Sequence, residues 1–377
     1  MSDVELLFLV LALIYAWECS CWLRWGSTGF VNWFGERWRP VKPISMLGNS
    51  KGGFVFAPVL PPLGGILTSH AFPVLISPDG VLPNSAASLQ TPSFVPFQDI
   101  RTIAVKGKKV IVNGQVLSKT PSSTLALQTA ATIRDLLKAA PQSRDGSIQK
   151  IWRERFDTRA IGQRWKEFEE RTAKLRIMAN VLFMYIFLCA PLAILSLGFG
   201  LSWPALLAGL FALTFSITFL FRRIHRHYYP AADDERFTHV LINMFSPATT
   251  IRARDVLSRP LLETFDPLAI AKVFCSEEQF KRLAAATLRD LHYPLPSVSA
   301  PDPVIGKIDA YARKHQQRAI EDFLKKSGLD LEALLRPPVL VDATCRSYCP
   351  RCQAQFTVIR GTCADCADLE LVPFGKN

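Results

Sequence analysis

The sequence predicts a multi-domain α+β integral membrane protein, in which three transmembrane helices carry a small β-rich domain, a helical domain and a metal-binding module. Three observations lead to this prediction. Of the 377 residues, 49% are hydrophobic, and this excess is concentrated, because residues 177–221 contain no charged side chain. Short β-branched runs separated by Gly and Asn turns lie between residues 72 and 139. Four cysteines near the C-terminus are spaced Cys-x2-Cys-x10-Cys-x2-Cys, and the length suits two or three domains.

The first transmembrane helix is expected at residues 5–23, an apolar run interrupted by Glu18 and about as long as a bilayer-spanning helix must be. A cleaved signal peptide is the alternative, but such a peptide has a basic start. Here Asp3 and Glu5 make the start acidic, and the basic residues follow the apolar run. We therefore predict an uncleaved anchor whose N-terminus lies outside.

Residues 24–71 are expected to form an interfacial and loop segment. Gly29–Pro40 mixes aromatic residues with arginines, a composition typical of segments that lie at a membrane surface. Pro58–Gly65 is rich in Pro and Gly and is expected to be a loop. Two thiols of the first helix, Cys19 and Cys21, can carry a lipid. They also fit as small apolar side chains, which is the reading we favour.

Residues 72–139 are expected to form the β-rich domain. Phe72–Ile76 has the composition of a strand and is ended by the turn residues Ser77–Gly80. Asn113-Gly114, between two apolar runs, is a strong hairpin signal. A helix is expected to follow from about Ser122 to Leu137. The further strands are expected at residues 94–97, 102–106, 109–112 and 115–117.

Val95–Ile100, followed by Ile103–Val105, is similar to the central strands of bacterial pleckstrin-homology-like domains, and the order of short strands closed by a helix fits that family. The resemblance implies a binding module without a catalytic centre. Another small α+β domain is the alternative. The lysines at the predicted hairpin tip can contact phosphate headgroups or form a solvated turn; they are Lys106, Lys108 and Lys109.

Residues 147–176 are predicted to be an amphipathic helical segment, because apolar residues such as Ile148 and Ile151 recur at helical spacing in a highly charged stretch. The uncharged stretch that follows fits two transmembrane helices, at 177–197 and 201–221, joined by a Gly-rich turn. A buried hairpin in a soluble protein is the alternative. It is disfavoured because helices of soluble proteins keep a polar face.

Basic residues border both ends of this hairpin, whereas the loop between its helices has no Lys or Arg. By the positive-inside rule both ends face the cytoplasm. We therefore place the protein in the plasma (inner) membrane, with its C-terminal domains in the cytoplasm. The net charge of +12 is explained by border residues that contact anionic lipid headgroups, and nucleic acid is the disfavoured partner. The border residues are Arg171, Lys174, Arg176, Arg222, Arg223 and Arg226.

Residues 233–336 are predicted to form a mainly helical cytoplasmic domain. Ser276–Gln279 has the form of a capping box and opens a helix. The stretch Leu291–Pro303 contains four prolines and is expected to be a linker. A further helix is expected at Ile305–Lys326, because Ser327-Gly328 is a typical helix end.

The C-terminal cysteines give the strongest chemical signal, because two short-spaced thiol pairs can close a tetrahedral S4 shell around Zn²⁺. Four thiolates leave no open position, so the zinc is expected to be structural, and free thiols indicate a reducing compartment. A redox dithiol or a metal-free loop is the alternative. Cys345 is a spare thiol nearby that can substitute as a ligand, although the paired spacing favours Cys349. The predicted ligands are Cys349, Cys352, Cys363 and Cys366.

Cys-Pro-Arg-Cys and Cys-Ala-Asp-Cys, within residues 345–374, closely resemble the zinc-ribbon family, in particular small ribbons at the ends of bacterial membrane and signalling proteins. Many such ribbons have Gly after each pair, where this chain has Gln353 and Ala367. From Cys345 to Asn377, four basic and three acidic residues leave a net charge of only +1, which disfavours nucleic-acid binding.

The sequence therefore predicts a non-enzymatic membrane scaffold or adaptor that presents cytoplasmic domains to a partner protein or lipid. The alternative is a membrane enzyme, or an accessory subunit of a transporter or synthase, with polar residues at the membrane border. Candidate residues for that alternative are Glu18, His225, His227 and Asp233. A metal site formed by the two histidines with Asp233 and Asp234 is disfavoured, because the basic border around His225 would repel a cation. The sequence contains no Gly-rich phosphate loop, nucleophile elbow or zinc-protease motif.

Overall fold

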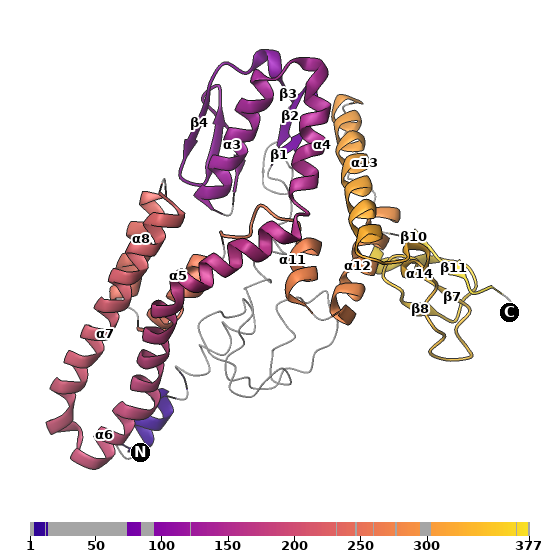
Figure 1. The fold of residues 1–377 in the computed structure, drawn as a ribbon. Coiled ribbons are helices and arrows are strands. Elements are labelled where there is room, and N and C mark those ends of the chain that lie inside the picture. The colour runs from indigo at the N-terminus through magenta and orange to yellow at the C-terminus, as the bar shows by residue number, and fades with distance from the viewer. Residues whose placement is uncertain are drawn as a thin grey trace. The chain divides into compact units, whose positions relative to one another are not determined.

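A computed structural model describes residues 4–11, 13, 74–83, 94–120, 122–230, 232–245, 247–258, 260–275, 277–294, 303–366 and 368–375 (Figure 1). The chain divides into two compact units. The first comprises Met1–Pro73, Arg101–Arg134 and Asp157–Phe274, and the second comprises Val74–Ile100, Asp135–Phe156 and Cys275–Asn377.

The predicted first span is described only in part. Residues 4–11 and 13 are helical, in agreement with the start of a helix at residues 5–23. The rest of that helix, with Glu18, Cys19 and Cys21, lies outside the described residues. So does the interfacial segment predicted at 24–71.

Two long apolar helices dominate the first unit. The helical path Thr158–Leu197 and the helix Ser202–Tyr228 are both long and apolar enough to cross a membrane, because each contains an 18-residue stretch of high mean hydropathy, 2.2 and 2.0 respectively. The first path comprises α5 (Thr158–Met184), the π-helical turn η6 (Tyr185–Cys189) and α6 (Ala190–Leu197). It begins where the Asp157 carboxylate accepts the backbone N–H groups of Arg159 and Ala160, an N-cap.

The border between the predicted amphipathic segment and the predicted second span does not interrupt α5. Its residues before the border alternate buried and charged positions, and those after it are apolar on all sides. No residue in this stretch breaks a helix, so the single helix α5 continues from the charged segment into the apolar one.

The turn between the two long helices is shorter than predicted. Gly198 alone reverses the chain, with φ of 77°, a conformation that glycine adopts at little cost. Helix α7 (Phe199–Tyr228) starts at the next residue, so Pro204 lies inside it. Pro204 is the sixth residue of the helix, so its missing N–H removes one helical hydrogen bond near the start of α7.

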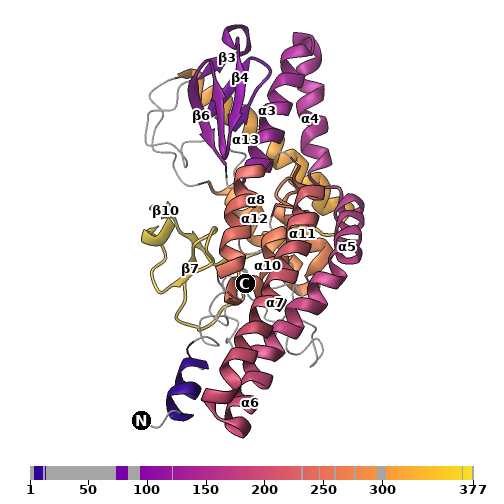
Figure 2. The same cartoon turned by 90° about the vertical axis from the view of Figure 1, so that its left-hand side faces the viewer.

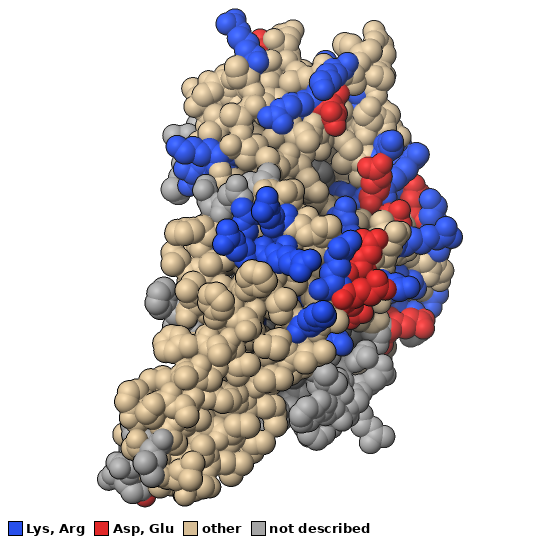
Figure 3. All heavy atoms as spheres, turned by 60° about the vertical axis from the view of Figure 1, so that its left-hand side comes forward, with Lys and Arg blue, Asp and Glu red and all other residues tan. Residues whose placement is uncertain are grey.

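The two long helices pack closely at one point. The Tyr185 hydroxyl donates a hydrogen bond of 2.7 Å to the carbonyl of Leu206. One turn further along α7, Gly209 lies against the same ring, and a Cβ atom there would come within 2.5 Å of the hydroxyl. Figure 3 shows the uncharged surface of this hairpin, with Lys and Arg side chains gathered beyond the apolar stretch.

Short helices of the first unit pack against the end of this hairpin where α5 begins and α7 ends, which we call the hairpin base. Helices α10 (Ala253–Ser258) and α11 (Pro267–Phe274) both contact α5, and α10 also contacts α7 (Figure 2). The other helices of this group are α8 (Asp233–Phe245) and α9 (Pro247–Ile251).

Arg254 is fully buried at this base. Its guanidinium donates to the Thr172 hydroxyl at 2.9 Å, lies 3.9 Å from the Glu169 carboxylate and stacks over the Phe168 ring. A buried charge is tolerated only with such partners, so Arg254 joins α10 to α5.

The first unit also contains a three-stranded antiparallel sheet of β4 (Ile103–Lys106), β5 (Lys109–Val112) and β6 (Gln115–Lys119), in the order β4-β5-β6. The predicted hairpin turns are confirmed. Asn113 and Gly114 both have positive φ, and the Asn113 side chain accepts the N–H groups of residues 101 and 102.

The second unit contains a second antiparallel sheet, in the order β1-β2-β3. Its strands are β1 (Val74–Ile76), β2 (Gly80–Pro83) and β3 (Val95–Pro96), followed by the short helix η4 (Phe97–Asp99). The six strands of residues 72–139 are thus divided between the two units, and α3 (Ser123–Lys138) crosses from the first to the second.

Three helices complete the second unit before the cysteine-rich segment: α4 (Arg144–Glu154), α12 (Glu277–His292) and α13 (Pro303–Lys326). The short helices η5 (Pro141–Ser143) and α14 (Leu331–Leu334) flank them. The predicted helical domain 233–336 therefore has its helices in both units, α8–α11 in the first and α12–α14 in the second.

Helices α4 and α13 are joined by polar side chains. The Tyr311 hydroxyl donates to the Asp145 carboxylate, His315 Nε2 lies 3.5 Å from it, and Gln149 donates to it at 2.7 Å. The hydrogen bond from Tyr311 is the main cause of a lowered pKa of Asp145. Below this cluster the rings of Phe156 and Phe323 pack 5.0 Å apart. The cluster thus fixes one helix against the other.

Candidate metal centre

The four predicted cysteine ligands come together at the C-terminal end of the second unit. The sulfur atoms of Cys349, Cys352, Cys363 and Cys366 all lie within 4.8 Å of one another. In the described part of the chain this is the one group of three or more His, Cys, Asp or Glu side chains that can hold a metal ion. Cys345 is half-buried and does not belong to it.

Small sheets hold the two cysteine pairs. Strands β11 (Val372–Pro373), β7 (Ser347–Tyr348) and β8 (Gln355–Phe356) form one antiparallel sheet in that order. Strands β9 (Thr362–Cys363) and β10 (Leu369–Glu370) form a second, with the helical turn η7 (Ala364–Cys366) between them. Residues 347–373 thus form two small antiparallel sheets around the cysteine pairs.

The first pair lies on a tight turn after β7. The Gln353 N–H donates to the Cys349 carbonyl at 2.9 Å, and the Cys349 N–H donates to the Ala354 carbonyl at 2.9 Å. This turn requires φ of 64° at Gln353, the position where many ribbons have Gly. The glutamine therefore adopts the glycine conformation, at a cost of about 1 kcal/mol.

The second pair is built differently. The Asp368 N–H donates to the Cys363 carbonyl at 3.1 Å, and the residue with positive φ is Asp368. Ala367, the residue directly after the pair, lies outside the described residues. The left-handed position of the second pair thus lies one residue later than in the first, on a residue type that tolerates it better than most.

The environment acts on the four thiols in different ways. Burial alone would disfavour the thiolate of Cys349, but hydrogen bonds from the backbone N–H groups of Cys352 and Arg351 outweigh it and lower the pKa of this thiol. Burial raises the pKa of Cys366 to about 12, and the neighbouring thiols add to the rise. The pKa of Cys352 is also raised, because the protein around it removes part of the solvent from its sulfur and the neighbouring thiols add to the effect, although the residue as a whole is exposed. A divalent cation would offset these costs by stabilising all four thiolates.

The core of this module consists largely of the thiols themselves. Cys349, Cys363 and Cys366 are buried together with Leu371, and Phe356 and Leu369 pack against them. Such a core removes little apolar surface from water, so it contributes little stability by itself. A bound metal ion would therefore be the main source of stability for this segment.

The donor set fits a tetrahedral metal ion. The Sγ atoms of Cys352 and Cys363 are 3.7 Å apart, and a tetrahedral centre with Zn–S bonds of about 2.3 Å has sulfur–sulfur edges of about 3.8 Å. Four sulfur donors fill a tetrahedral shell. The site can therefore hold a metal ion and leaves no position for a substrate.

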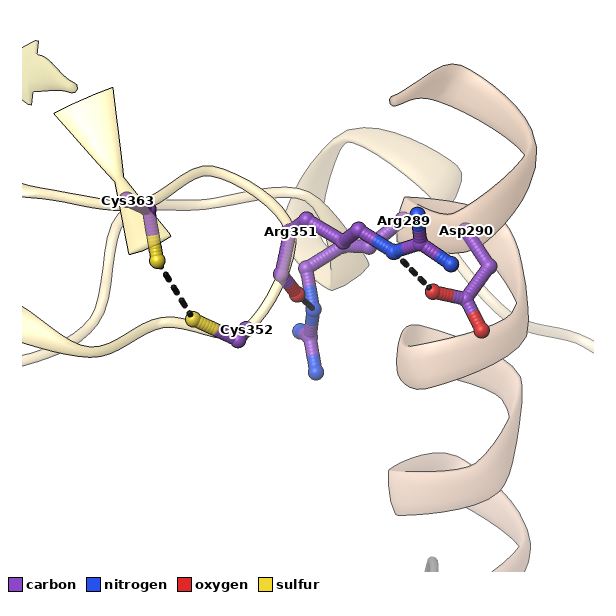
Figure 4. A network of polar contacts seen from close by, with 5 residues as sticks. All are labelled: Arg289, Asp290, Arg351, Cys352 and Cys363. Atoms are coloured by element: carbon purple, nitrogen blue, oxygen red, sulfur yellow. Dashed lines mark hydrogen bonds and ion pairs between the residues drawn. The ribbon is translucent and has the colours of Figure 1, made fainter. Parts of the chain in front are cut away.

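Side chains of helix α12 form hydrogen bonds with the turn that carries the first cysteine pair (Figure 4). The Arg351 side chain donates to the Asp290 carboxylate at 2.8 Å, and the Arg289 side chain donates to the Arg351 carbonyl at 3.2 Å. Burial lowers the pKa of Arg289, and the charges of Asp290 and Cys352 partly restore it. We call these two contacts of Arg351, with Asp290 and with Arg289, the latch. Because Arg351 lies between two of the predicted ligands, the latch fixes the position of the metal site on the helix.

Sequence analysis did not find the latch. Arg351 stands within the first cysteine pair, but nothing in the sequence links it to a dipeptide about 60 residues earlier. The two segments come together only in the folded protein, so their interaction could not be predicted from the sequence.

Of the other candidates, the two whose side chains the structure describes, His225 and His227, belong to no further metal-binding group. His225 is buried among the rings of Phe221, Tyr229 and His239, and His227 is exposed and contacts Tyr228. Their surroundings are those of packed aromatic side chains. Asp233 and Asp234 are in the first turn of α8, and the structure does not describe their side chains.

Comparison with known proteins assigns no family: no family model, no curated protein and no solved structure matches the chain. The argument about function therefore rests on the residues and their geometry.

Proposed function

We propose that the protein is a non-enzymatic integral membrane scaffold, anchored by its apolar helices in the plasma (inner) membrane. Its C-terminal segment is a zinc ribbon that presents a contact surface to a partner protein in the cytoplasm. The four clustered thiols carry this proposal, because a closed S4 shell suits a structural zinc ion and not a catalytic one.

Two further features support the proposal. The apolar helices Thr158–Leu197 and Ser202–Tyr228 provide an anchor, and the basic borders at Arg171–Arg176 and Arg222–Arg226 suit anionic lipid headgroups on the cytoplasmic side. We also propose that residues 72–139 serve as a pleckstrin-homology-like binding module, since they supply six short antiparallel strands and a following helix.

Metal analysis of the full-length protein in detergent tests the first part. We expect about one zinc per chain, lost in Cys349→Ser and retained in Cys345→Ser. The second variant is a matched control, because it removes a nearby thiol that lies outside the cluster. Zinc retained by Cys349→Ser, or absent from the intact protein, would contradict the metal centre.

A crosslinking pull-down from native membranes tests the second part. A partner captured by the intact protein and by Cys345→Ser, but lost in Cys349→Ser, would support the adaptor role. The same partners with all three proteins would show that the ribbon is no contact surface, whether or not it holds zinc.

A further inference from the structure

The four thiols differ sharply in access to solvent. Cys349, Cys363 and Cys366 are 0%, 1% and 5% exposed, whereas Cys352 is exposed. A small oxidant that approaches from solvent therefore meets the sulfur of Cys352 first. Its reactivity follows from this access, because oxidation of thiols depends on exposure and on thiolate character.

The sulfur of Cys363 lies next to that of Cys352. The two Sγ atoms are 3.7 Å apart, and Figure 4 shows them facing each other from the two cysteine pairs. A bond between them would remove one ligand from each pair, which leaves two thiolates for the metal. Two thiolates hold zinc far less tightly than four.

We propose that Cys352 and Cys363 form a peroxide-sensitive pair, and we call its oxidation the switch. Oxidation of the pair releases the metal ion and weakens the contacts between α12 and the ribbon. The proposal rests on the zinc centre proposed above. The latch is affected because Arg351 is the direct neighbour of Cys352, and its contacts with Arg289 and Asp290 require the turn to keep its shape.

The chemistry needs hydrogen peroxide as the oxidant. The Cys352 thiolate attacks one peroxide oxygen, the O–O bond breaks, and a sulfenic acid and hydroxide result. The Cys363 thiolate then attacks the Cys352 sulfur, the S–S bond forms and a second hydroxide leaves. Two thiolates thus lose two electrons in all, one peroxide is reduced, and a dithiol reductant reverses the change.

Peroxide titration of the zinc-loaded full-length protein in detergent tests the pair. We expect one zinc released per peroxide consumed, measured with a chromogenic chelator, and recovery of the site after dithiothreitol and zinc are added. Cys345→Ser is the control and should respond as the intact protein does.

Peptide mapping identifies the bond, because the sequence allows each ligand to be separated. Trypsin cuts after Arg351 and Arg360, and a protease that cuts before aspartate separates Cys363 from Cys366 at Asp365. We expect a disulfide that joins the peptides of Cys352 and Cys363. We also expect hydrogen exchange of the Arg289–Asp290 segment to rise at least tenfold on oxidation.

The outcomes separate the two proposals. If the purified protein holds no zinc, the proposed metal centre is wrong, and the proposed oxidation of Cys352 and Cys363 is wrong as well, because it depends on that centre. If it holds zinc but keeps it while Cys189, Cys275 or Cys345 is oxidised, the switch alone is wrong. A disulfide within one cysteine pair, without Cys363, would also overturn it.

Discussion

The cysteine-rich segment 345–374 and the base of the apolar helical hairpin are stabilised in different ways. The buried core of the ribbon is three cysteines and one leucine, whereas the hairpin base buries large side chains such as Phe168, Leu175 and Phe221 completely. The small core of the cysteine-rich segment would therefore need the proposed metal ion for its stability, whereas the hairpin base depends on packing and on one buried guanidinium. The difference predicts that one treatment can unfold either region and leave the other intact.

Removal of the metal should have the largest effect. Structural zinc contributes about 10–16 kcal/mol to the folding of zinc-finger peptides, far more than the small core of the ribbon can replace. A strong zinc chelator should therefore abolish the hydrogen-exchange protection of residues 345–374 in the full-length protein. The helices α5 and α7 should keep theirs. Equal loss in both regions would show that they do not fold independently.

Truncation of the buried arginine should have the next largest effect, and on the other region. Arg254→Ala removes the hydrogen bond to Thr172 and the ion pair with Glu169, and it opens a cavity under Phe168, so we expect a loss of about 2–4 kcal/mol, mainly from the cavity. Thermal unfolding in detergent measures it. Lys174→Ala, an exposed position on the same helix α5, is the control and should change the midpoint little. Zinc content should be unchanged in both variants.

A clash within the hairpin should cost less. A Cβ atom at Gly209 would lie 2.5 Å from the Tyr185 hydroxyl, so Gly209→Ala should destabilise the hairpin by about 1–3 kcal/mol. Gly200→Ala on the same helix, where nothing lies within 4 Å of the new atom, is the matched control. Combining Gly209→Ala with Tyr185→Ala should make the glycine change cost less than it does alone. Strict additivity of the two changes would contradict the contact.

The sequence was informative where local patterns decide the structure. The uncharged stretch, the Asn113-Gly114 turn and the cysteine spacing each depend on neighbouring residues, and each corresponds to an observed element. The continuous helix α5 was not predicted, because the change from an amphipathic to an apolar pattern resembles a boundary between two elements. A change of pattern does not by itself end a helix, however, because both patterns are compatible with a helical backbone.

Long-range contacts could not be predicted at all. Nothing local distinguishes Arg254 from the other arginines of the chain, although among the arginines that the structure describes it is the fully buried one. The latch between Arg351 and α12, and the division of the six strands between two units, likewise depend on how distant segments meet. These features carry the stability of the hairpin base and the position of the metal site.

The smallest expected effect tests the strained turn of the ribbon. Gln353 has φ of 64°, which favours glycine by about 1 kcal/mol, so Gln353→Gly should tighten zinc binding about fivefold in competition with a chelator. Ala354→Gly is the matched control, because Ala354 is not among the residues with positive φ. There the flexible residue should weaken binding by a similar factor. If both changes weaken zinc binding equally, the turn stores no strain, and the glutamine is held there by contacts of its own side chain.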